Sequence, residues 1–228
     1  MRPVAVITGA SRGIGRAAAL AFASRGLNVA LMSRSPEALD RVAAEVRQLG
    51  VTALVVPCDV SVAADVDAAR DRVLRDLGGP AVVVANAGVV RRGHVVALSE
   101  ADWDFVVGVN LKGAFLTARA FLPAMLACRK GRFVAVGSIS GTVGTAAQSA
   151  YCASKWGVTG LVKSLAEELR GSGVQALCVL PGSVDTDMLA GSGYEPEMTA
   201  ADVAGLIAYA GLDAPAAMNG SAVEMFGA

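Results

Sequence analysis

Tyr151 and Lys155 stand four residues apart in the stretch YCASK. If this stretch is helical, that spacing puts both side chains on one face of the helix, about 6 Å apart along its axis. Tyrosine has an unperturbed pKa of about 10, and a nearby ammonium group stabilises the phenolate and lowers that pKa. The pair is therefore suited to exchange a proton with a substrate oxygen, whereas Tyr151 alone would be a packed aromatic residue.

Two polar residues earlier in the chain extend this constellation. Ser138 ends the apolar run 131–138, which predicts a strand, and ligands of parallel sheets bind outside the carboxyl ends of the strands. The Ser138 hydroxyl is then expected near Tyr151, where it can donate a hydrogen bond to an oxygen that becomes anionic. Asn110 lies in a helical stretch although asparagine is a poor helix former, which favours a functional role over a polar residue at a helix bulge.

The elements that must position these residues alternate along the chain. Short apolar runs predict strands at 4–8, 27–33, 52–58, 81–85, 131–138, 174–180 and 221–226. The stretches between them predict helices at 12–25, 35–50, 61–78, 99–127, 149–170 and 201–209. Ser35, Ser61 and Ser99 are expected to cap helices, and Pro123 to break or kink one. Repeated strand–helix units predict a Rossmann-type, doubly wound parallel α/β sheet with helices on both faces, in one domain over residues 1–228.

The first strand runs directly into the glycine-rich turn TGASRGIG. Gly9 permits the tight turn, Gly13 lets backbone approach a pyrophosphate, and Gly15 lets the next helix pack closely on the sheet. The start of that helix offers unpaired N–H groups and the positive end of its dipole to phosphates. A single glycine would fit an ordinary strand–helix turn, but three in this context favour a nucleotide site.

This segment resembles the short-chain dehydrogenase/reductase family, whose first turn commonly reads T-G-x-x-x-G-I-G. The YCASK stretch matches the family's Y-x-x-x-K, and NAG at 86–88 matches its N-N-A-G with Ala85 in place of the first Asn. The run PGSVDT at 181–186 matches P-G-x-V-x-T, so the resemblance covers nearly the whole chain. It implies an oxidoreductase that interconverts a carbonyl and a secondary alcohol, with Asn110, Ser138, Tyr151 and Lys155 as its catalytic residues.

The end of the second strand bears on the choice of cofactor. NAD-preferring folds place an acid there for the ribose 2′-hydroxyl, but this strand ends in Ser33 and Arg34. Arg34, with Arg12 from the glycine-rich turn, offers guanidinium groups that match phosphate geometry. Basic residues at these positions mark NADP(H) preference in the family, so NADP(H) is predicted; the alternative is that each arginine is a solvated surface charge.

The resemblance implies a cofactor site assembled from the loops that follow the strands. Its predicted members are Gly9, Ser11, Arg12, Gly13, Ile14, Gly15, Ser33, Arg34, Asp59, Val60, Asn86, Ala87, Gly88, Tyr151, Lys155, Pro181, Gly182, Val184 and Thr186. Asp59 and Val60 are expected beside the adenine, and Asp59 is also a candidate helix cap. Val184 and Thr186 are expected near the nicotinamide amide and phosphates, with a simple strand-ending turn as the alternative.

The composition of the chain limits which other partners are expected. Lys+Arg and Asp+Glu both number 20, and a chain without net charge is a poor match for nucleic acid. No run approaches about 18 uninterrupted apolar residues, so no membrane partner is expected. One histidine, His94, and four cysteines without a C-x-x-C pair predict no metal site and reduced thiols. The beginning of the chain has no secretory signal pattern, which favours a cytoplasmic location.

The substrate is expected to be a small carbonyl compound or alcohol, and the resemblance favours a 3-oxoacyl thioester. Residues 187–199 are shorter than the helical lid of many family members and contain Gly191, Gly193 and Pro196, which predicts a short, mobile flap. His94 lies in the other substrate segment, 89–98, as a pocket residue or a solvated one. Family members commonly form dimers or tetramers, and the apolar composition fits a homo-oligomer of closed symmetry, expected here to be a tetramer.

A nucleotide sensor and a structural assembly protein are the two alternatives to an enzyme. A sensor that binds NADP(H) without turnover should have lost the tyrosine or the lysine, and both are present. A structural assembly protein would not require Arg12 and Arg34. The sequence therefore favours an enzyme over either alternative.

Overall fold

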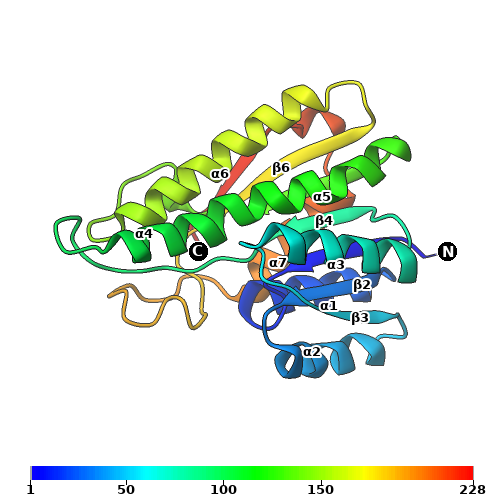
Figure 1. The fold of residues 1–228 in the computed structure, drawn as a ribbon, viewed down its shortest axis with the longest axis horizontal. Helices are drawn as coiled ribbons and strands as arrows, with labels where there is room; N and C mark the ends of the chain where they lie inside the picture. The colour runs from blue at the N-terminus through cyan, green and yellow to red at the C-terminus, as the bar shows by residue number, and fades with distance from the viewer. Residues whose placement is uncertain (1, 228) are drawn as a thin grey trace.

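The computed structural model describes residues 2–227 and contains one seven-stranded, wholly parallel sheet in the order β3-β2-β1-β4-β5-β6-β7 (Figure 1). The strands are β1 (Val4–Thr8), β2 (Asn28–Ser33), β3 (Ala53–Pro57), β4 (Val82–Ala85), β5 (Gly131–Val136), β6 (Val174–Pro181) and β7 (Ala222–Met225). The order reverses between β1 and β4, where crevices form at the carboxyl ends of such sheets. The predicted doubly wound fold is confirmed.

Helices cover both faces of the sheet. They are α1 (Gly13–Ser24), α2 (Pro36–Gln48), α3 (Ala63–Asp76), α4 (Glu100–Val107), α5 (Gly113–Ala127), α6 (Ser149–Glu168) and α7 (Ala200–Leu212). A π-helical turn, Gly108–Lys112, joins α4 to α5, and short 3₁₀ turns lie at Ile139–Gly141 and Ala216–Met218. Buried side chains of α3, α5 and α6 pack on one face, and those of α1, α2 and α7 pack on the other.

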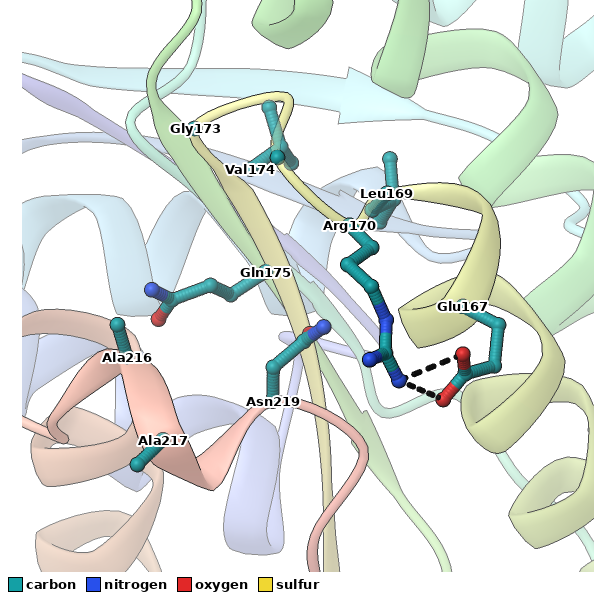
Figure 2. Close-up of a pocket in the computed structure, with 10 residues that line it drawn as sticks. Glu167, Leu169, Arg170, Gly173, Val174, Gln175, Ala216, Ala217 and Asn219 are labelled. Atoms are coloured by element: carbon teal, nitrogen blue, oxygen red, sulfur yellow. Dashed lines mark hydrogen bonds and ion pairs between the residues drawn. The ribbon is translucent and has the colours of Figure 1, made fainter.

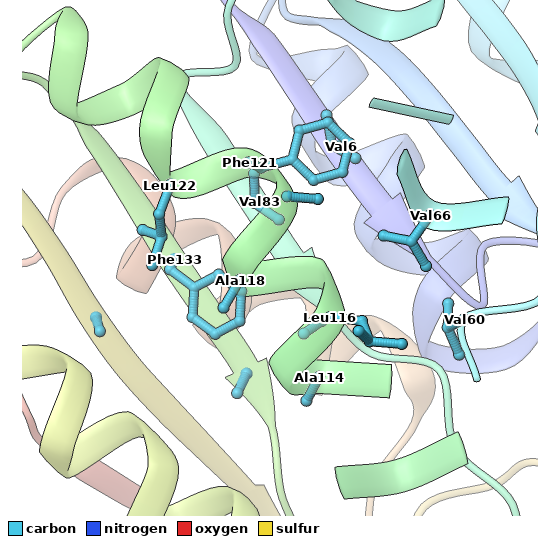
Figure 3. Close-up of a cluster of buried hydrophobic side chains, with 14 of the residues drawn as sticks. Val6, Val60, Val66, Val83, Ala114, Leu116, Ala118, Phe121, Leu122 and Phe133 are labelled. Carbon is cyan, nitrogen blue, oxygen red and sulfur yellow. The ribbon is translucent and has the colours of Figure 1, made fainter. Parts of the chain in front are cut away.

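The two cores follow from the alternation of side chains along each strand. In β1, Val4 and Val6 face the layer that contains α5, whereas Ala5 and Ile7 face the layer that contains α1. Figure 3 shows the first core, where Phe121 of α5 lies over the strands and Phe133 of β5 packs beneath the same helix. Both phenylalanines are fully buried, so their packing anchors α5 to the sheet.

Two details of the predicted helices are wrong. Ser61 does not cap α3: the cap position is Val62, which makes no side-chain cap, and the Ser61 hydroxyl instead donates to Asp59 Oδ1 at 2.7 Å. The long stretch is interrupted not at Pro123, through which α5 continues to Ala127, but at the π-helical turn 108–112. The Ser61 outcome is local, through Asp59, whereas the π-helical turn is held by hydrogen bonds between Asn110 and the distant Val89.

The run Glu100–Ala127 is long and apolar enough to cross a membrane by length and composition alone. Within the protein, 61% of its most apolar window is buried. Its hydrophobic residues therefore serve packing against the sheet, as in the core helix of a globular domain.

The tightest approach of a helix to the sheet generates a prediction about stability. A Cβ added to Gly15 would lie 2.1 Å from the Gly9 carbonyl oxygen and 2.6 Å from Asn86 Nδ2. Because backbone must move to make room, Gly15→Ala should lower the free energy of unfolding by about 1–3 kcal/mol, measured by urea denaturation. Gly160→Ala, on an exposed helical position of α6 with open space around it, is the control and should be neutral or stabilising by up to about 1 kcal/mol. Equal effects of the two substitutions would contradict this account.

Candidate active site

The glycine-rich turn presents backbone rather than side chains at the start of α1. Gly9 and Gly13 have φ angles of +64° and +52°, in the left-handed region that favours glycine. The N-cap residue, Arg12, makes no side-chain cap, and the first turn of α1 contains no acid. The first N–H groups of α1 are thus left to an anion, and this cradle fits the phosphates of a dinucleotide.

Thr8 and Asn86 hold this turn in place. The Thr8 hydroxyl accepts hydrogen bonds from the backbone N–H groups of Asn86 and Ala87, both at 3.0 Å. The Asn86 amide donates to the Thr8 carbonyl oxygen at 2.9 Å and to that of Gly9 at 3.3 Å. Thr8 was not among the predicted site residues, although a polar residue at the end of a buried strand was the signal that could have found it. The end of β4 is therefore tied to the end of β1.

The loop after β6 lies against the same turn. The Thr186 methyl carbon is 3.2 Å from the place where a Gly13 Cβ would stand. Val184 is buried and forms an isolated bridge to Met198 at the far end of the flap. Segments more than 170 residues apart in the chain, as Arg12 and Asp187 are, are thus brought to one place.

The predicted 2′-phosphate residues have protein partners of their own. Arg12 forms an ion pair with Asp187 at 3.0 Å, but the two side chains are 78% and 73% exposed, so the pair is weak. Arg34 lies near Asp59. Partial burial raises the pKa of Asp59, but hydrogen bonds from Ser61 and the charge of Arg34 outweigh this and lower it. Asp59 does not cap α3, because it accepts from Ser61, which precedes the helix.

Lys155 is a buried cation. Its side chain is on the first turns of α6, only 4% exposed, and its Nζ donates to the Val136 carbonyl oxygen at 2.8 Å. The same nitrogen is 5.6 Å from the centre of the Tyr151 ring, so the predicted common helix face is present. Burial lowers the pKa of Lys155 to about 8, partly offset by Cys178.

Tyr151 differs from the expectation in its pKa. Burial is the largest influence and raises that pKa, while Ser138 and the charge of Arg92 lower it by less. The pKa of Tyr151 therefore lies above its usual value, because desolvation of the phenolate dominates. Ser138 is buried at the end of β5, and its Oγ accepts from the Ser140 N–H at 3.1 Å.

Asn110 is held in the π-helical turn by a complete set of partners. Its Oδ1 accepts from the Val89 N–H at 2.8 Å, and its Nδ2 donates to the Val89 carbonyl oxygen at 2.9 Å and to Ser154 Oγ at 3.0 Å. A Cβ on Gly88 would lie 3.6 Å from both Asn110 Oδ1 and Lys155 Nζ. The structure thus brings Asn110 and Lys155 to either side of Gly88. Ser154 was not predicted, although it stands within the YCASK stretch.

Two hollows lie near the sheet, at opposite edges. One, of about 390 Å³, lies among the loops that follow β4 and β5; it is lined by residues 93–95, 144–147, Ser149 and Cys152, and includes His94. The other, about 450 Å³, lies at the amino-terminal end of β6, where Arg170 reaches across to Glu167 (Figure 2). Only the first lies at the carboxyl edge where ligands of this fold bind.

Comparison with known proteins agrees with this geometry. The family model described as "short chain dehydrogenase" matches residues 3–196. The chain is 39% identical over 189 residues to a 3-oxoacyl-(acyl-carrier-protein) reductase, FabG, of Staphylococcus aureus, covering 82% of this chain and 77% of the relative.

Solved structures match over almost the whole chain. A short-chain type dehydrogenase/reductase from Mycobacterium marinum has a TM-score of 0.94 at 31% identity and covers 99% of this chain and 94% of its own. An alcohol dehydrogenase from the archaeon Thermococcus sibiricus, solved in complex with 5-hydroxy-NADP, has a TM-score of 0.90 at 31% identity, covering 99% and 96%.

The buried Lys155 generates a prediction about pH. Its pKa is about 8 in the folded protein and 10.5 when exposed, so between these values the unfolded chain binds more protons. The free energy of unfolding of the wild type should therefore rise, relative to Lys155→Met, by up to about 1.4 kcal/mol per pH unit above pH 8. Urea denaturation at about pH 7.5, below this range, and at about pH 9.5, within it, tests this. Lys163→Met, at an exposed position of α6, is the control; a Lys155→Met difference that does not change with pH would contradict the prediction.

Proposed function

The chain belongs to the short-chain dehydrogenase family, and from this premise we propose that it uses NADP(H), with Tyr151 as general acid and base. Membership makes the chain an oxidoreductase that acts on CH–OH and C=O groups with a nicotinamide cofactor. The observation that carries the proposal is the meeting of Asn110, Tyr151 and Lys155 beside an uncapped, glycine-rich helix start.

The surroundings of β2 support NADP(H) over NAD(H). No acid follows the strand at the position that would bind the ribose 2′-hydroxyl, and Arg34 is exposed there. Arg12 is the second candidate cation, and its exposed pair with Asp187 is weak enough to be exchanged for a phosphate. The archaeal alcohol dehydrogenase that carries an NADP analogue supports the same preference by similarity.

The chain's own residues manage the proton and the charge on the substrate oxygen. When bound, the nicotinamide supplies or accepts the hydride. In the reducing direction, the Tyr151 hydroxyl donates its proton to the substrate oxygen, and the Ser138 hydroxyl donates a hydrogen bond to the same atom. Lys155, held by the Val136 carbonyl beside the tyrosine ring, stabilises the phenolate that remains. In the oxidising direction this phenolate accepts the proton of the alcohol.

A 3-oxoacyl thioester is the proposed substrate class. The S. aureus relative, whose name states that chemistry, is 39% identical over most of this chain. The hollow of about 390 Å³ at the carboxyl edge is lined largely by small and apolar residues, which suits an acyl chain. The short flap, residues 187–199, forms no helix.

Assembly and location are also proposals. Phe115, Leu126 and Trp156 are exposed on α5 and α6, and exposed apolar side chains on neighbouring helices support a homo-oligomer, as a dimer or tetramer. All four cysteines are free, which supports a reducing compartment such as the cytoplasm. The alternative of a sensor without turnover has no feature in its favour, because the catalytic residues are retained.

Removal of the tyrosine hydroxyl tests the mechanism. Tyr151→Phe should lower kcat for NADPH-dependent reduction of 3-oxoacyl thioesters and small ketones by about 10²–10⁴-fold, with NADPH binding retained, because only the proton donor is lost. Consumption of NADPH, followed by its absorbance, measures the rate, and quenching of protein fluorescence measures binding. Tyr209→Phe, on the exposed side of α7, is the matched control. Undiminished turnover by Tyr151→Phe would refute the assigned role.

A charge reversal tests the cofactor preference. Arg34→Asp should lower the ratio of kcat/KM for NADPH to that for NADH by about 10–100-fold, because a cation that binds the phosphate is replaced by an acid that repels it. Arg41→Asp, at an exposed position of α2, controls for the change in net charge. If the wild type prefers NADH, or if both variants behave alike, the phosphate role of Arg34 is wrong.

A further inference from the structure

Two neighbouring arginines on the loop after β4 have different partners. Arg91 is neutralised: its guanidinium bonds to Asp102 at 3.1 Å and lies 4.8 Å from the centre of the Phe105 ring. Arg92 has no carboxylate within ion-pair distance in the part of the chain that is described. Its Nη2 donates instead to the Met188 carbonyl oxygen at 2.8 Å, and its Nη1 to that of Ala190 at 3.2 Å.

Both carbonyls belong to the flap, residues 187–199, nearly 100 residues away in sequence from Arg92. The flap is also tied at its ends, by the exposed Arg12–Asp187 pair at its root and, near its return, by the Val184–Met198 bridge and backbone hydrogen bonds from Glu197 and Met198 to Ser183. Arg92 joins the flap to the loop after β4, whose residues 93–95 line the hollow of about 390 Å³. A planar guanidinium can hold two carbonyl oxygens at once, which a lysine ammonium does less well.

Backbone carbonyls hold Arg92 without cancelling its charge. That charge lowers the pKa of Tyr151, against burial, which raises it. The other groups that face Tyr151 are Lys155 and Cys152 of its own helix and Ser138 after β5; on the flap side, Asp187 is occupied by Arg12. Arg92 thus has two separable properties. Its fork of donors binds the flap, and its charge acts on Tyr151.

We propose that Arg92 is a positioning residue for the reaction, which fastens the flap to the loop after β4 and keeps a positive charge that no carboxylate of the described residues pairs with. The consequence for catalysis rests on the proposed function. The fork orders the flap for substrate binding, so its loss raises KM. The charge favours the phenolate, and so sets the pH at which alcohol oxidation begins. Neither property requires Arg92 to touch the reacting atoms.

Two substitutions separate the fork from the charge. Arg92→Gln removes the charge and the fork, whereas Arg92→Lys keeps the charge and loses the fork. Ethyl 3-oxobutanoate with NADPH and ethyl 3-hydroxybutanoate with NADP⁺ serve as probes. Arg92→Gln should raise KM about tenfold and move the rise of kcat/KM for oxidation to higher pH, because the pKa of Tyr151 increases. Arg92→Lys should keep the raised KM but restore the wild-type pH profile.

Two measurements that need no substrate test the same proposal. Hydrogen exchange of peptides covering residues 187–191 should be faster in both variants than in the wild type. Titration of tyrosine absorbance, with Tyr151→Phe as the difference reference, should give a higher pKa for Tyr151 in Arg92→Gln alone. Arg41→Gln, far from the flap on α2, should change neither.

These experiments separate failure of the Arg92 proposal from failure of the proposed function. Unchanged flap exchange, or a Tyr151 titration that does not respond to Arg92→Gln, overturns the proposal. If the wild-type protein turns over neither probe nor any other carbonyl compound, the proposed function fails, and the exchange and titration results still decide the role of Arg92.

Discussion

The site depends on how the end of β1 is fastened to the end of β4. The Thr8 hydroxyl binds two N–H groups of the β4 turn, and the Asn86 amide binds the carbonyls of Thr8 and Gly9. Thr8 is buried in this junction and Asn86 and Ala87 are half-buried, so water competes less for its hydrogen bonds. The junction shapes the glycine-rich turn on one side, and on the other it leads to Gly88, close to both Asn110 and Lys155. The proposed cofactor cradle and the proposed proton-transfer residues therefore share one structural support.

The edge formed by the carboxyl ends of the strands also contains features that cost stability. Lys155 keeps an ammonium group in a position where burial opposes its charge, with the Val136 carbonyl as its partner. The helix that carries Asn110 gives up regular geometry for a π-helical turn, so that the amide can reach both the N–H and the carbonyl of Val89. Such features are expected where a site needs groups that a stable core would exclude. The apolar packing around Phe121 and Phe133 supplies stability that offsets these unfavourable features.

Charge at the rim of the site is distributed among arginines with distinct partners. Arg12 and Arg34 lie on the side of the glycine-rich turn, each near a carboxylate, at Asp187 and Asp59 respectively. Arg91 braces its loop against α4, and Arg92 binds the backbone of the flap. Because the flap is short and has no helix of its own, Arg12 and Arg92 attach it in place of a packed core. The same residue type thus serves loop bracing and flap attachment according to the group opposite it, and phosphate recognition is the role proposed for Arg34.

Much of this protein could be predicted from its sequence because the signals are local. Strand and helix order follows from apolar runs and amphipathic stretches, the glycine spacing follows from what a tight turn and a close helix require, and the spacing of Tyr151 and Lys155 follows from helical geometry. The break before α5 was wrong because it depends on Val89, which approaches Asn110 from another segment. The Ser61 cap was wrong because the neighbouring Asp59 accepts its hydroxyl.

The sequence by itself determined the fold class, the glycine-rich turn and the common helix face of Tyr151 and Lys155, since each follows from the type and spacing of neighbouring residues. Only the tertiary structure decided the pKa values of Tyr151 and Lys155, the partners of Thr8 and Asn110, and the contact of Arg92 with the flap. Desolvation and long-range hydrogen bonds set these, and both depend on what the folded chain brings within a few ångströms of a group, which spacing along the sequence does not contain.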